Sequence, residues 1–137
     1  MNHMHYLQIA AVLHLGLLCA GLTMPHAVKL RQHLSTLPPF IRSLFWVYFT
    51  FIGSCLIGFG LLTWFAANEM AAGEPVARAL AIFLAVFWLS RLAAGIFVFD
   101  VRPYLTNWFY RLGNLAINLV FVYLTTIYAW TALKGAL

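Results

Sequence analysis

Four long apolar segments dominate the sequence, and they constrain the fold more than any other feature. Residues 6–27, 43–67, 79–99 and 113–133 consist mostly of leucine, alanine, valine, isoleucine and phenylalanine, and Arg91 is the one charged residue in them. Each segment is long enough to cross a bilayer, because a transmembrane helix needs about 20 apolar residues. The strands of a membrane β-barrel are shorter and alternate apolar with polar residues, unlike these continuous runs. The sequence therefore predicts an all-α integral membrane protein with four transmembrane helices.

Little of the chain remains outside these segments. It has 137 residues, of which 64% are hydrophobic and 8% charged, and soluble domains do not have this composition. Consecutive spans joined by short connections run antiparallel and are usually neighbours in space. We therefore expect residues 1–137 to form a single domain, an up-down bundle of four transmembrane helices.

The connections carry residues that start helices. Pro38 and Pro39 cannot continue a preceding helix but suit the first turn of the next, so the second span should start directly after them. The Gly-Glu-Pro run at 73–75 is a similar start signal for the third span, with a carboxylate near the positive end of the helix dipole. Residues 103–110 are rich in aromatic side chains and should either lie at the membrane interface or extend the fourth helix.

Basic residues are distributed unevenly between the two sides of the predicted bundle. The first and third connections hold five lysines and arginines, whereas the second connection and the C-terminal tail hold two. The positive-inside rule then predicts both termini on the outer side of a bacterial-type inner (plasma) membrane. The net charge of +5 indicates anchoring to the inner leaflet and not nucleic-acid binding, because the basic residues flank the spans. The five are Lys29, Arg31, Arg42, Arg102 and Arg111, and the two are Arg78 and Lys134.

Arg91 is the strongest candidate for a functional residue. An arginine in the middle of a membrane helix costs about 2.5–3.5 kcal/mol on insertion scales, so it usually faces protein or water and has a partner. At 100° per residue, Asn107, Asn114 and Asn118 fall on one side of the fourth span, and Asn118 lies at a depth within reach of Arg91. We therefore predict a ligand-binding site in which Arg91 hydrogen-bonds to Asn118 and Asn114. Further candidate members are Tyr48, His26 and Thr23.

The charge of Arg91 has two interpretations. Asparagine satisfies hydrogen bonds but leaves a positive charge uncompensated, so the site could bind a lipid phosphate, a carboxylate or an anionic cofactor group. Alternatively, the side chain reaches towards the inner headgroups. Asp100 is a poor partner in either case, because nine residues on an ideal helix place it about 180° away from Arg91.

Histidine and cysteine suggest a cofactor only weakly. Haem and chlorophyll-type pigments in helical bundles are usually held by histidines on facing helices, but only His14 lies well inside a span and the other three spans have no histidine. We therefore predict no cofactor and no metal site, and we favour a His14 that hydrogen-bonds within the bundle. Single axial ligation of haem or pigment by His14 is the alternative. Cys19 and Cys55 are expected to be buried structural thiols.

The sequence contains no catalytic motif, neither a nucleophile elbow, a phosphate loop, a His-Glu-x-x-His run nor paired carboxylates. The first hypothesis is thus a non-enzymatic accessory or assembly subunit of a membrane complex. Its partners would be the lipid bilayer and other membrane subunits or further copies of itself, and not nucleic acid. The second hypothesis is a binding or transport module for an anionic lipid or small solute at Arg91. The third is a redox subunit that holds haem, quinone or pigment near His14.

Overall fold

The computed structural model describes residues 3–27, 29–98 and 107–136, and these residues form helices without any strand. In chain order the helices are α1 (His3–Ala27), α2 (Leu30–Leu34), α3 (Pro39–Phe65), α4 (Ala67–Ala72), α5 (Pro75–Phe97) and α6 (Trp108–Ala136). Four of them, α1, α3, α5 and α6, are long and apolar enough to cross a membrane. The predicted all-α class and its four apolar helices are therefore confirmed.

Helix starts follow the proline and glycine signals in the sequence. α3 begins at Pro39, the position that the proline pair predicts. α5 begins at Pro75, and Gly73 ends α4 just before it with a φ of 77°, a left-handed conformation that favours glycine. α6 begins at Trp108, so the described aromatic residues before the fourth predicted span, 108–110, extend the helix.

Two of the predicted connections contain short helices. α2 lies in the first connection, and Lys29 precedes it with a left-handed φ of 53°. α4 follows α3 with only Ala66 between them. These connections are therefore more helical than predicted, because even one turn of helix satisfies backbone groups that a loop would leave to solvent. Residues 99–106, which hold most of the predicted third connection including Asp100, lie outside the described residues.

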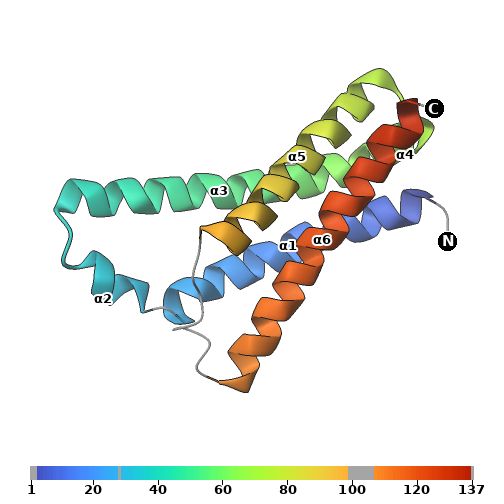
Figure 1. Ribbon diagram of the computed structural model, residues 1–137. Coiled ribbons are helices and arrows are strands. Elements are labelled where there is room, and N and C mark those ends of the chain that lie inside the picture. The colour runs from blue at the N-terminus through green and yellow to red at the C-terminus, as the bar shows by residue number, and fades with distance from the viewer. Residues whose placement is uncertain (1–2, 28, 99–106, 137) are drawn as a thin grey trace.

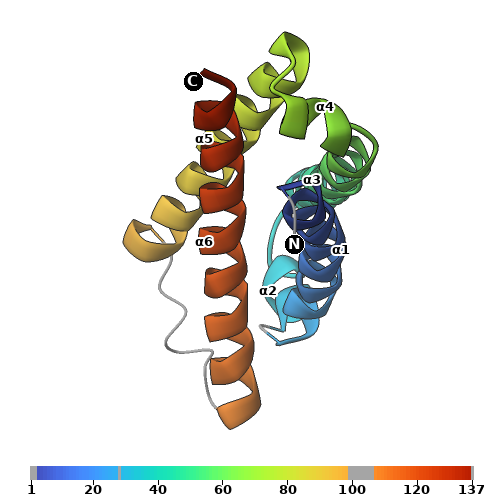
Figure 2. The ribbon, with the colours of Figure 1, turned by 90° about the vertical axis from the view of Figure 1, so that its right-hand side faces the viewer.

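The long helices are arranged as two hairpins (Figure 1). α1 packs along α3, and α5 packs along α6, and these are the two most extensive contacts between helices. The hairpins cross obliquely and touch mainly through α1 and α6. α4 lies at the end where the described chain begins and finishes, and it contacts both hairpins (Figure 2).

The buried core formed by the long helices occupies only the half of the fold near α4. The buried residues of α1 fall within 3–17, those of α5 within 77–88 and those of α6 within 121–132. α3 contributes only Gly60 and Thr63. In the other half, the long helices have no buried residue among those described. The two hairpins are thus held together at one end only.

Candidate functional site

A polar cluster inside the core joins all four long helices. It consists of His14 from α1, Thr63 from α3, Trp88 from α5 and Tyr128 from α6, and we call these residues the central polar cluster. His14, Thr63 and Tyr128 are 0% exposed and Trp88 is 2% exposed. Because buried polar groups must find hydrogen-bond partners, their pairing determines how the two hairpins meet.

Both ring nitrogens of His14 are engaged. Its Nδ1 lies 2.8 Å from the carbonyl oxygen of Ala10, and the indole Nε1 of Trp88 donates to its Nε2 at 3.2 Å. A carbonyl can only accept and an indole N–H can only donate, so the proton of this imidazole lies on Nδ1. The favoured interpretation of His14, a hydrogen-bonded residue within the bundle, is confirmed. A metal that bound Nε2 would have to displace the Trp88 indole.

A second pair completes the central polar cluster. The hydroxyl oxygens of Thr63 and Tyr128 lie 2.6 Å apart and join α3 to α6. The ring of Tyr128 also contacts the His14 ring, with centroids 6.1 Å apart. Gly60 allows this approach, because a Cβ there would lie 3.1 Å from the carbonyl oxygen of Ala11 and 3.2 Å from Cβ of His14. The cluster therefore forms beside a close approach of the α3 backbone to α1.

The Thr63–Tyr128 pair should couple the stabilities of the two hairpins. We expect Thr63→Val and Tyr128→Phe to destabilise the fold less than additively, with a coupling energy of about 0.6–1.7 kcal/mol, the range of hydrogen bonds between membrane helices. Unfolding of both single variants and the double variant in mixed detergent micelles would measure this. The same cycle with Thr126→Val in place of Thr63→Val is the control, because Thr126 is exposed. Strictly additive effects for the buried pair would contradict the interaction.

The seam between α5 and α6 sets the depth of Arg91. The rings of Trp88 and Phe121 stack across this seam, with centroids 5.5 Å apart and planes 22° apart. Antiparallel helices have the same rise, so a residue three positions after Trp88 lies level with a residue three positions before Phe121. Arg91 therefore lies level with Asn118.

The side chain of Arg91 lies between Gly95 of its own helix and Phe121 of α6. Its guanidinium carbon lies 5.1 Å from the centre of the Phe121 ring, and its Nη1 atom would lie 3.5 Å from a Cβ placed on Gly95. Arg91 is exposed, and Asn114 and Asn118 are partly exposed on α6. A cation over an aromatic face is favourable, so Phe121 is a contact that the sequence reasoning missed. The hydrogen bonds from Arg91 to Asn118 and Asn114 stay a prediction.

The other candidate members of the Arg91 site lie on the α1–α3 hairpin. Tyr48 is 59% exposed on α3, and His26 is exposed in the last turn of α1. Thr23 is exposed as well, and its hydroxyl donates to the carbonyl of Ala20 at 2.8 Å. Their membership of a common ligand site with Arg91 stays a prediction.

A polar pair near the chain ends was also missed by sequence reasoning, which placed His3 before the first span. His3 belongs to α1 and is 8% exposed, and its Nε2 lies 2.6 Å from the hydroxyl of Thr131 on α6. That hydroxyl donates to the carbonyl of Ile127, so it accepts the Nε2 proton of His3. The remaining Nδ1 has no hydrogen-bond partner in the described part of the chain. The pair joins α1 to α6 at the end of the fold near α4.

The two cysteines differ from the expectation drawn from the sequence. Cys19 and Cys55 are exposed on the outside of the fold, so the expectation of buried thiols is wrong. Both lie on the α1–α3 hairpin, in or near the half without a core. Few side chains of other helices cover the surfaces of α1 and α3 there. Within residues 3–27, 29–98 and 107–136, no group of three histidine, cysteine or acidic residues could hold a metal ion.

Comparison with models of protein families, with curated proteins and with solved structures finds no match to this chain. Its function must therefore be inferred from its own residues.

Proposed function

We propose that this chain is a non-enzymatic accessory or assembly subunit of a membrane complex. In this proposal, another membrane protein covers the half of the fold that the chain's own helices leave without a core. The observation that carries the proposal is the position of three uncharged polar side chains, Ser90 on α5 and Asn114 and Asn118 on α6. They lie in the half without a core, on helices long and apolar enough to cross a membrane.

The proposed placement is an up-down bundle in a bacterial-type inner membrane, with both termini on the outer side. It is supported by the basic residues at the end of the fold opposite α4, which the positive-inside rule assigns to the inner surface. Lys29, Arg31 and Arg42 lie in or next to α2 and the start of α3, at the opposite end of α3 from α4. The half without a core then lies in the inner leaflet.

Polar residues on α5 and α6 are costly in that position. Ser90 is exposed, and Asn114 and Asn118 are partly exposed. Hydroxyl and amide side chains in a membrane normally face protein, water or headgroups, because hydrocarbon offers them no hydrogen bonds. A helix of a partner subunit packed against this surface would supply such bonds.

Asn118→Leu tests the proposed interface. We expect this variant to retain a partner roughly threefold to tenfold more weakly, because one amide hydrogen bond between membrane helices is lost. Native mass spectrometry of the full chain, purified from its host in mild detergent, would measure the ratio of chain to partner. The control is Thr126→Leu, since Thr126 is an exposed polar residue in the other half of α6. Purification of the wild-type chain as a monomer at every detergent concentration would contradict the proposal.

An anionic lipid or small solute bound at Arg91 is a second candidate function. It is favoured by the position of Arg91, whose guanidinium lies over Phe121 and whose helix position is level with the partly exposed Asn118. The same spectra distinguish it from a subunit role, because a bound lipid adds a few hundred daltons and a protein partner adds far more.

A redox role near His14, with haem, quinone or pigment, has less support because Trp88 and Ala10 already engage its ring. A visible absorption band of the purified protein would favour that role.

A further inference from the structure

α2 and the start of α3 form a hollow with a basic lining. Arg31 and Leu34 of α2, together with Ser35 directly after it, occupy one face, since residues three and four positions apart are neighbours on a helix. Arg42 and Trp46, four positions apart, occupy the facing side of α3, and the turn through the prolines brings the two faces together. The hollow has a volume of about 380 Å³ and is open to its surroundings. We call these five residues the basic hollow.

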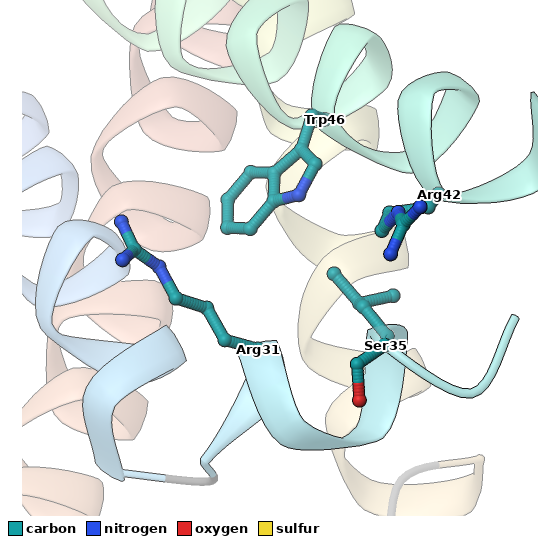
Figure 3. A pocket seen from close by; sticks show the side chains of 5 residues that line it. Arg31, Ser35, Arg42 and Trp46 are labelled. Atoms are coloured by element: carbon teal, nitrogen blue, oxygen red, sulfur yellow. The ribbon is translucent and has the colours of Figure 1, made fainter. Parts of the chain in front are cut away.

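Figure 3 shows how the charged groups of the basic hollow are placed. The indole of Trp46 extends between the side chains of Arg31 and Arg42, whose guanidinium groups lie on either side of it. No ion pair is described for either arginine. The two carboxylates among the described residues, Glu69 and Glu74, are in α4 and just before α5, beyond the far end of α3. The described residues therefore leave two positive charges in the basic hollow without a nearby negative charge.

The donors in the basic hollow suit an oxyanion. Each guanidinium presents five N–H groups in a planar fork, and this geometry matches phosphate oxygens in pairs. The hydroxyl of Ser35 donates to the carbonyl of Gln32 at 2.6 Å and turns away from the Trp46 ring in Figure 3, so its proton is already used. The indole N–H of Trp46 has no described hydrogen-bond partner and remains available as a donor. The hydrogen bonds to an oxyanion would thus come from the guanidinium groups of Arg31 and Arg42 and from the indole N–H of Trp46.

We infer that the basic hollow binds the phosphate of an anionic phospholipid. This step rests on the membrane placement proposed above, which puts α2 and the start of α3 at the inner surface, where anionic headgroups gather near basic residues. Tryptophan commonly lies at headgroup depth with its ring towards the acyl chains, and Phe45 and Phe49 pack against Trp46 on the same helix. The first carbons of the acyl chains would contact this aromatic surface while the phosphate bridges the two arginines.

Native mass spectrometry of the full chain with added lipid tests the inference. The probes are phosphatidylglycerol and phosphatidylcholine with the same acyl chains, and the variants are Arg31→Gln and Arg42→Gln. We expect phosphatidylglycerol to bind at least tenfold more tightly than phosphatidylcholine, and each variant to weaken its binding roughly tenfold. The matched control is Lys29→Gln, which removes the same charge from an exposed residue beside the basic hollow and should change binding less than twofold.

The results of these measurements can support or overturn lipid binding in the basic hollow. Equal binding of the two lipids would overturn the inference, and so would an effect of Lys29→Gln as large as that of Arg31→Gln, because general surface charge would then suffice. Loss of lipid in Arg91→Gln, with retention in both hollow variants, would assign the lipid to Arg91 instead. Displacement by inorganic phosphate would support the phosphate site but assign it to a soluble anion. Retention of the protein partner by the hollow variants separates a failure here from a failure of the proposed subunit role.

Discussion

His14→Leu is expected to lower the free energy of unfolding by about 1–3 kcal/mol, the cost of a buried donor left without an acceptor. Leucine fills most of the imidazole volume but offers nothing to the indole N–H of Trp88, which donates to His14 at 3.2 Å. Because Trp88 is 2% exposed, neither water nor lipid headgroups can replace the lost acceptor without opening the core. Denaturation of the full chain in mixed micelles would measure the change, with the loss of helix monitored by far-UV circular dichroism.

Two further variants isolate the hydrogen bond of His14 from its packing. His26→Leu is the matched control, because His26 lies on the same helix but is exposed, and it should change stability by less than about 0.5 kcal/mol. Combining His14→Leu with Trp88→Phe removes the donor as well as the acceptor. The double variant should therefore be more stable than the sum of the two single losses predicts. Equal effects of the His14 and His26 substitutions would show that the Trp88 bond contributes nothing.

The sequence predicts the helices well because one strong signal determines them. Apolar length decides whether a segment can cross a membrane, and prolines and glycine mark the starts at Pro39 and Pro75. The short helices α2 and α4 could not be predicted in the same way, because five or six residues carry too little periodicity. The oblique crossing of the two hairpins depends on side-chain packing over the whole interface, which no local pattern expresses.

The sequence points to candidate site residues only where one helix carries the signal. The asparagines of α6 stand out because they repeat on a single face, and Arg91 stands out by its charge. The central polar cluster takes one residue from each of four helices, so its members are scattered through the sequence and depend on how the hairpins cross. One usable signal existed: a histidine inside an apolar span needs donors or acceptors at its own depth, and the tryptophan, tyrosine and threonine residues of the other spans are the available candidates.

Gly60→Val is expected to be the other strongly destabilising substitution, with a loss of about 1–3 kcal/mol or more from overpacking. A Cβ at this position would lie 3.1 Å from the carbonyl oxygen of Ala11, and a backbone atom in the middle of α1 cannot rotate away. α3 would have to move outwards, which would also separate Thr63 from Tyr128. In a background with the other four tryptophans replaced by phenylalanine, the emission of Trp88 should shift as its surroundings change, in addition to the loss of stability in micelle denaturation.

Gly58→Val separates this steric effect from helix propensity. Gly58 lies two residues earlier on the same helix, and a Cβ there would meet no atom within 4 Å. Both substitutions replace glycine by the same residue within α3, and valine is the better helix former by a few tenths of a kcal/mol, so propensity alone would stabilise both variants slightly. The Gly58 variant should therefore be neutral or slightly more stable, while the Gly60 variant is destabilised. If both variants lost the same stability, the close approach of α3 to α1 at His14 would not be what holds the first hairpin together, and the central polar cluster would lose its steric basis.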